Sequence, residues 1–134
     1  MERKKMSTVP LASHELKNGL NMVFLDQSKK IAADRWYIHI EVEIRIPVQK
    51  KWFSEESIDE GHFHVILDSL GEEVVFRQKR ERNFVSEEAK DRIVKEICDH
   101  ALQMGQTYCS SDTFAARTIL KAFREKNRQH PSIP

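Results

Sequence analysis

Glycine and proline are scarce in this sequence, with four of each among 134 residues. Loops that bring several backbone amides against a phosphate depend on glycine, because glycine adopts positive φ angles at little steric cost. The sequence contains no phosphate-binding loop, no dinucleotide-binding fingerprint, no His-Glu-x-x-His helix and no Gly-x-Ser-x-Gly elbow. Because none of these motifs is present, the sequence gives no reason to predict an enzyme of these classes, and we predict no cofactor.

Cysteine, excess charge and long apolar runs are scarce as well. The two cysteines, Cys98 and Cys109, are too few for a disulfide framework, so we predict a reducing cytoplasm. A formal net charge of +1 argues against a generally basic nucleic-acid binder, although a local patch is compatible with it. No apolar run approaches the roughly 18 residues of a membrane span, and residues 1–8 lack the apolar core of a signal peptide. We therefore expect a cytoplasmic protein without a membrane partner.

Charged and apolar residues are both abundant, at 32% and 40% of the chain. That balance is typical of one globular domain with a charged surface. The two ends show no hydrophobic periodicity, and the first of them carries a small basic cluster. We predict a flexible tail over residues 1–13, a single α+β domain over residues 14–126 and a second flexible tail over residues 127–134.

The clearest pattern is the alternation of apolar and polar residues between Arg35 and Val48. The apolar positions are every second residue, namely Trp36, Ile38, Ile40, Val42, Ile44 and Ile46. Because successive side chains of a strand point to opposite faces, this pattern predicts a strand with one buried and one charged face. Residues 36–46 would span about 36 Å, roughly twice the length of a typical strand. We therefore expect this strand to bend or to offer an edge to another chain.

Two further strands are predicted around the long one. Residues 20–25 follow an Asn-Gly turn signal and form the first strand, and a polar loop over residues 26–34 then leads back into the long strand. Residues 73–82 form the third strand. We favour a third strand that lies beside the first, because a helical connection permits a right-handed crossover that makes the second and third strands parallel. The alternative, a third strand beside the second, would give a mixed sheet.

Residues 57–71 favour a helix over a strand. Ser57 opens a capping box, apolar residues recur at helical spacing, and Gly71 is placed to end the helix. In the competing strand, His62 and His64 would share a face and could bind one metal. Residues two apart on a helix do not face each other, so the helix predicts no metal there.

Two amphipathic helices complete the predicted fold. The first follows a Ser86 cap and ends at Gly105, and the second follows a cap at Ser110 or Ser111. The order strand, strand, helix, strand, helix, helix predicts an α+β fold. In this fold, helices pack on one face of a small three-stranded, mainly antiparallel sheet.

His39, Glu41 and Glu43 lie on the charged face of the long strand and form one candidate site. Carboxylates two apart on a strand point the same way, so Glu41 and Glu43 could bind a metal or share a proton. The outer face of the third strand offers Arg77 and Lys79, and opposite charges on neighbouring strands pair. We favour this structural pairing over a ligand or metal site, and we predict no metal.

Arg77, Lys79, Arg80 and Arg82 form the densest basic run and a candidate nucleic-acid contact. Alternation places the first two on one face of the strand and the last two on the other, which dilutes any single patch. A sheet face that reads single-stranded RNA offers exposed aromatic side chains for stacking, and here Tyr37 alone would serve. Nucleic-acid binding is therefore an alternative and not the favoured function.

Trp52 and Phe53 follow two lysines in the loop after the long strand. If buried, they would cap the core; if exposed, they would anchor a partner. Together with the length of the second strand, they motivate the leading hypothesis of a non-catalytic module that self-associates or binds an unidentified protein. The alternatives are nucleic-acid binding through the basic run and, less favoured, a small-ligand or metal site at His39, Glu41 and Glu43.

Overall fold

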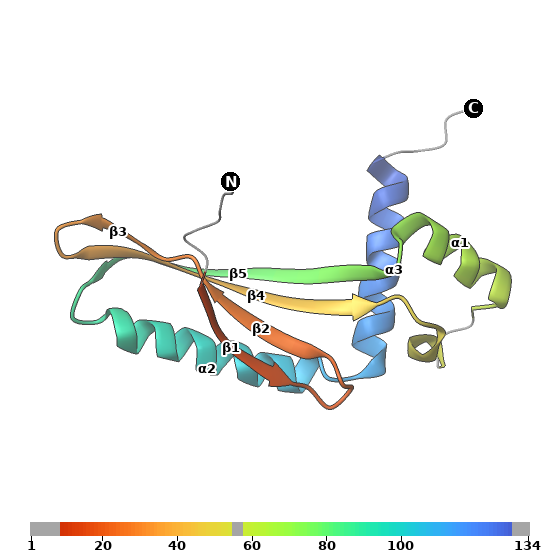
Figure 1. Cartoon of the computed structure of the whole chain (residues 1–134), viewed down its shortest axis with the longest axis horizontal. Coiled ribbons are helices and arrows are strands. Elements are labelled where there is room, and N and C mark those ends of the chain that lie inside the picture. The colour runs from red at the N-terminus through yellow and green to blue at the C-terminus, as the bar shows by residue number, and fades with distance from the viewer. Residues whose placement is uncertain (1–8, 55–57, 130–134) are drawn as a thin grey trace.

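Five strands and three α-helices make up the computed structural model, which describes residues 9–54 and 58–129 (Figure 1). The strands are β1 (Val9–Glu15), β2 (Asn21–Asp26), β3 (Lys29–Ala32), β4 (Arg35–Pro47) and β5 (Glu73–Ser86). The helices are α1 (Glu60–Leu70), α2 (Lys90–Tyr108), α3 (Asp112–Gln129) and a short 3-10 helix, η1 (Lys50–Phe53). The predicted α+β class is confirmed, but the antiparallel sheet has five strands instead of three.

β4 is the central strand and is paired on both sides over most of its length. β5 pairs with it from Arg35 to Pro47, whereas β2 pairs with residues 40–44 and β3 with residues 35–37. Because β5 occupies one side of β4 along its whole length, β2 and β3 follow each other along the opposite side. The long strand therefore offers no edge of its own to another chain. Among the described residues, β1, β3 and β5 each pair with a single strand, and β5 is the longest of these three edge strands.

The predicted position of the third strand is wrong, because β5 lies beside β4 and runs antiparallel to it. The connection between them does not cross the sheet. It stays at the end where β4 finishes, where η1 and α1 lie (Figure 1). The Val48 backbone N donates to the Glu72 backbone O at 2.8 Å and closes this connection. A helical connection that returns to the same end of the sheet produces an antiparallel neighbour, not the crossover that we assumed.

Two strands lie where no strand is predicted. β1 brings residues 9–13 of the predicted tail into the sheet by pairing with β2, and β3 forms within the predicted loop by pairing with β4. Neither has a strong apolar alternation, and all four residues of β3 are exposed. Such strands are held by backbone pairing with a neighbour instead of by burial. At the other end, α3 includes residues 127–129, so the fold extends beyond the predicted domain of residues 14–126 at both ends.

The helices α2 and α3 cover one face of the sheet, whereas α1 lies at its end (Figure 1). The side chains beneath them on β4 are fully buried, namely Ile38, Ile40, Val42, Ile44 and Ile46. α2 runs along the length of the sheet, and α3 stands across the end where η1 and α1 also lie (Figure 1). The opposite face carries the charged side chains of β4, and none of the described helices covers it.

α1 settles the choice between helix and strand for residues 60–70 in favour of the helix. Its N-cap is Asp59, whose carboxylate accepts a hydrogen bond from the His62 backbone N at 2.7 Å; the predicted cap, Ser57, lies outside the described residues. Gly71 ends the helix with a φ of 84°, which glycine adopts easily. His62 and His64 therefore point in different directions, as the helix requires.

Candidate functional site

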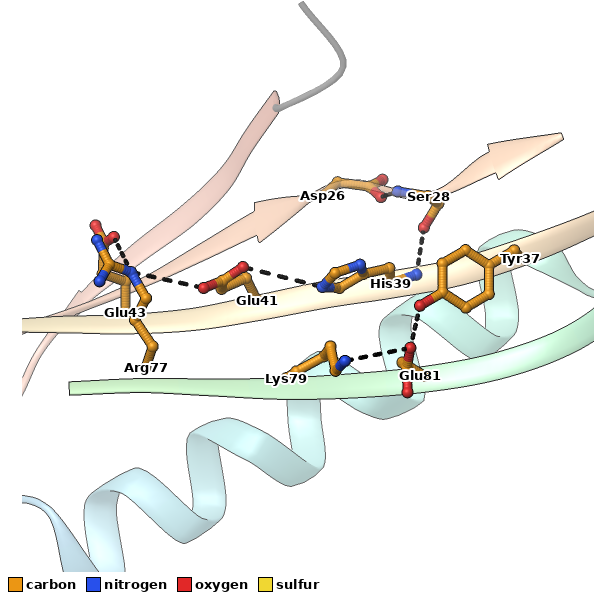
Figure 2. Close-up of polar contacts among 9 residues, drawn as sticks. All are labelled: Asp26, Ser28, Tyr37, His39, Glu41, Glu43, Arg77, Lys79 and Glu81. Carbon is orange, nitrogen blue, oxygen red and sulfur yellow. Dashed lines mark hydrogen bonds and ion pairs between the residues drawn. The ribbon is translucent and has the colours of Figure 1, made fainter. Parts of the chain in front are cut away.

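The face of the sheet opposite the helices carries a polar network on β4 and β5 (Figure 2). The register places Glu43 beside Arg77, Glu41 beside Lys79 and His39 beside Glu81. The three β4 side chains are half-buried although none of the described helices covers them. The structure thus brings together the candidate residues His39, Glu41 and Glu43 with half of the basic run.

Arg77 bridges the two carboxylates of this network. Its Nε lies 3.3 Å from Glu43 Oε2 and 3.6 Å from Glu41 Oε2. Arg45 Nε lies 3.6 Å from the other carboxylate oxygen, Glu43 Oε1. Arg45 Nη1 lies 2.9 Å from Glu73 Oε1 on β5. Cross-strand pairs of this kind contribute a few tenths of a kcal/mol each. These contacts favour a structural role for Glu41 and Glu43 over proton transfer or metal binding.

Tyr37 and Glu81 form the other half of the network. The Tyr37 hydroxyl donates to Glu81 Oε2, and Lys79 Nζ lies 3.7 Å from the same oxygen (Figure 2). The hydrogen bond to Glu81, followed by burial and the charge of that carboxylate, raises the pKa of Tyr37. The same hydrogen bond lowers the pKa of Glu81, to which the charge of Lys79 also contributes. The pair is therefore a neutral phenol bound to a carboxylate.

In this network, His39 has a ring nitrogen that forms no hydrogen bond. Its Nε2 is buried without a hydrogen-bond partner and lies 3.9 Å from Glu41 Oε1, which is too long for a hydrogen bond. Its ring also packs edge-on against Tyr37. Within the described residues, no group of three His, Cys, Asp or Glu side chains could hold a metal ion. His39 and Glu41 do not form a hydrogen-bonded acid-base pair.

Trp52 and Phe53 do not form a surface for a partner. They are 2% and 4% exposed and belong to η1, which packs against α3. The Trp52 Nε1 donates to the Pro47 backbone O at 2.8 Å, and Phe53 stacks edge-on against Phe63. Both residues cap the core, the first of the two roles that the sequence allows, and neither is exposed enough to anchor a partner. In this position the indole N–H has a hydrogen-bond acceptor, and both aromatic rings are removed from water.

Arg80 and Arg82, the other half of the basic run, lie on the helix side of β5. They line a cleft of about 300 Å³ together with Ile93, Ile97 and His100 of α2. Neither arginine contacts a carboxylate among the described residues, in contrast to Arg77 and Lys79. The sequence pattern separated the two halves of the basic run correctly, but it contained no signal that His100 would join Arg80.

A second cleft of about 420 Å³ lies farther along the same boundary between β5 and the helices. Its lining combines aromatic, hydroxyl and basic side chains, chiefly Phe76, Tyr108, Phe114, Arg117 and Lys121. Tyr108 is 65% exposed, and Phe76 stacks edge-on against Phe114. Arg117 and Lys121 contact no carboxylate within the part of the chain that the structure describes.

One helix stripe connects the two clefts. His100, Met104 and Tyr108 are four residues apart along α2, so they share one face of the helix. All three are exposed, and His100 lines the first cleft while Tyr108 lines the second. We call the combined surface the β5 seam; it comprises Phe76, Arg80 and Arg82 of β5, Ile93, Ile97, His100, Met104 and Tyr108 of α2, and Phe114, Arg117 and Lys121 of α3.

No protein-family model, curated protein or solved structure matches this chain. None of the helices among the described residues is long and apolar enough to cross a membrane.

Proposed function

We propose that this protein is a non-catalytic interaction module that binds an extended, acidic segment of a partner protein along β5. The observation that carries the proposal is the pairing of β5. This 14-residue strand is hydrogen-bonded to β4 on one side and to no other strand among the described residues. Its open edge adjoins the β5 seam.

An open strand edge is a template for another strand. Its unpaired N–H and C=O groups can hydrogen-bond to any extended backbone, and pockets beside the edge then select the side chains. Phe76 and Arg80, which line the two clefts, are four residues apart, or about 13 Å along the strand. An added strand could therefore place two of its side chains, four positions apart, into the two clefts.

The charges of the seam favour an acidic partner. Arg77 and Lys79 are already paired with carboxylates on the outer face of the sheet. Arg80 and Arg82 in the first cleft, and Arg117 and Lys121 in the second, have no such partner among the described residues. A segment with Asp or Glu opposite these side chains would gain charge-assisted hydrogen bonds.

The same charges argue against a second copy of this chain as the partner. Residues 77–82 carry four basic side chains and one acidic side chain, a net charge of +3. A symmetric pairing of two β5 edges would bring this charge against itself, and basic residues on an edge strand are a known device against self-pairing. We therefore favour a different protein over self-association, and we propose the cytoplasm as its location because both cysteines are free.

Selection from phage-displayed random decapeptides tests the proposal, followed by affinity measurement with fluorescent peptides. We expect binders enriched in Asp and Glu, and binding weakened at least tenfold by Arg80→Glu or Arg82→Glu. Lys29→Glu on β3 is the matched control, because this exposed lysine lies on the other side of β4. Amide hydrogen exchange along β5 should also slow in the complex, because strand addition protects its N–H groups. Binders without acidic residues, or unchanged exchange in β5, would overturn the proposal.

Single-stranded nucleic acid is the second candidate, and Tyr108 is the observation in its favour. This exposed ring lies beside Arg117 and Lys121, the combination that stacks a base and binds its phosphates. The sequence predicts too few exposed aromatic side chains for base stacking on the charged face of the sheet. That argument does not apply to this cleft, which lies between β5 and the helices. Binding of a labelled oligonucleotide that weakens steeply with salt, and that Tyr108→Ala reduces, would favour this candidate over the peptide.

A further inference from the structure

Arg80 is held in a defined position by neutral groups. Its Nε and Nη2 donate to Gln78 Oε1 at 3.3 and 3.0 Å, and its Nη1 lies 3.3 Å from His100 Nδ1. A guanidinium group has five N–H donors and no acceptor. His100 Nδ1 must therefore be the acceptor, which places the ring proton of a neutral imidazole on Nε2.

These contacts leave donors available in the cleft. Three of the five Arg80 N–H groups are used by Gln78 and His100, so two remain for a ligand. Arg82 uses Nη1 to bind the backbone O of Glu81 at 2.8 Å. Glu96 is the acidic residue of the lining, and its Oε2 lies 3.1 Å from Arg92 Nη1, which offsets its charge. Among the described residues, the cleft thus holds two arginines that contact no carboxylate and one orientated histidine.

We propose that this cleft binds the phosphate monoester of a phosphorylated serine or threonine, an inference that rests on the proposed docking of a peptide along β5. A phosphate monoester carries a charge of about −1.5 to −2 and three acceptor oxygens, which matches two arginine forks and an imidazole N–H. A carboxylate offers two oxygens and a single charge, so it would leave donors of the cleft unused.

The apolar part of the cleft fits the rest of such a side chain. Ile93 and Ile97 lie on the same face of α2 as His100 and line the cleft beside the arginines. They can contact the short carbon stem of phosphoserine or the methyl group of phosphothreonine. Arg80 is on β5 itself, so a phosphorylated residue of a strand added to β5 would lie next to the cleft.

An NMR titration with inorganic phosphate tests the cleft without a peptide. We expect saturable shifts of the Arg80 and Arg82 Nε–H signals and of the His100 ring, with sodium chloride at equal ionic strength as the reference. Arg80→Gln and Arg82→Gln should each weaken binding at least tenfold, whereas Lys29→Gln should leave it unchanged. Shifts that do not saturate, or that persist in Arg80→Gln, would overturn the phosphate site.

A peptide series separates this inference from the proposed function. One selected acidic decapeptide is prepared with phosphoserine, glutamate or serine at each acidic position in turn. At one position we expect phosphoserine to bind at least tenfold more tightly than glutamate, with the gain lost in Arg80→Gln. Equal binding of all three forms would reject the phosphate site and leave the docked peptide. Phosphate binding without any peptide binding would reject the docked segment, and with it our assignment of the phosphate to a protein side chain.

Discussion

Gly105 of α2 lies directly against the end of the Met22 side chain of β2. A Cβ atom at position 105 would come within 2.6 Å of Met22 Cε and still closer to its Sδ. Both residues are buried, and α2 continues past Gly105 to Tyr108. The prediction that Gly105 ends the helix is therefore wrong, because α2 continues to Tyr108. The glycine allows α2 to approach the sheet closely.

Gly105→Ala should lower the free energy of unfolding by about 1–2 kcal/mol. Overpacking against Met22 costs about 1–3 kcal/mol, and the gain in helix propensity offsets at most about 1 kcal/mol. Urea denaturation would measure the change. Met22→Ala removes the obstructing atoms, so the double variant should be more stable than the sum of the two single effects predicts. Additivity within about 0.5 kcal/mol would contradict the close packing.

Phe84 has a φ of 58°, a left-handed backbone conformation that residues other than glycine seldom adopt. It lies at a bulge in β5, and its 64% exposed ring packs over the Arg35 guanidinium. Asparagine tolerates this conformation better than other side chains do, whereas alanine keeps the strain and loses the ring contact. We expect Phe84→Asn to be about 1 kcal/mol more stable than Phe84→Ala in thermal or urea unfolding. The reverse order would show that the backbone strain at this position is not relieved by asparagine.

Removal of the Glu81 carboxylate should lower the pKa of the Tyr37 phenol toward its ordinary value. In the native protein, ionised Tyr37 would lose its hydrogen bond and face a negative charge, so its pKa is raised. Titration at 295 nm in a Tyr108→Phe background reports Tyr37 alone, because the chain has two tyrosines. Glu81→Ala should shift the curve to lower pH. Glu87→Ala is the control, since Glu87 binds Trp36 instead.

Trp52→Ala should destabilise the fold by about 3–5 kcal/mol, as expected for a large buried aromatic side chain. It should also leave the Pro47 carbonyl without the indole N–H. Lys51→Ala serves as the control, because Lys51 is exposed and stacks on the Trp52 ring, a contact worth about 0.5–1 kcal/mol. Denaturant unfolding of both variants checks the prediction. A small effect of Trp52→Ala would mean that η1 does not cap the core.

The elements with a strong local pattern were predictable from the sequence. The alternation in β4 determined both the strand and its buried face, and helical spacing with Gly71 at the end determined α1. The separation of Arg77 from Arg80 onto opposite faces of β5 follows from the same alternation. These properties depend on the direction in which consecutive side chains point, which a short stretch of sequence specifies.

Other properties were decided by tertiary structure. β3 is a strand because β4 lies beside it, and β5 lies next to β4 because its connection returns at one end. Position 105 accommodates a glycine inside a helix because a Cβ there would collide with Met22. The β5 seam belongs to this class, since Arg80 and His100 meet only after α2 packs along the sheet. Local sequence patterns specify which face of a strand or helix a side chain occupies. Which strands and helices lie next to each other is determined by the packing of the whole chain around its core.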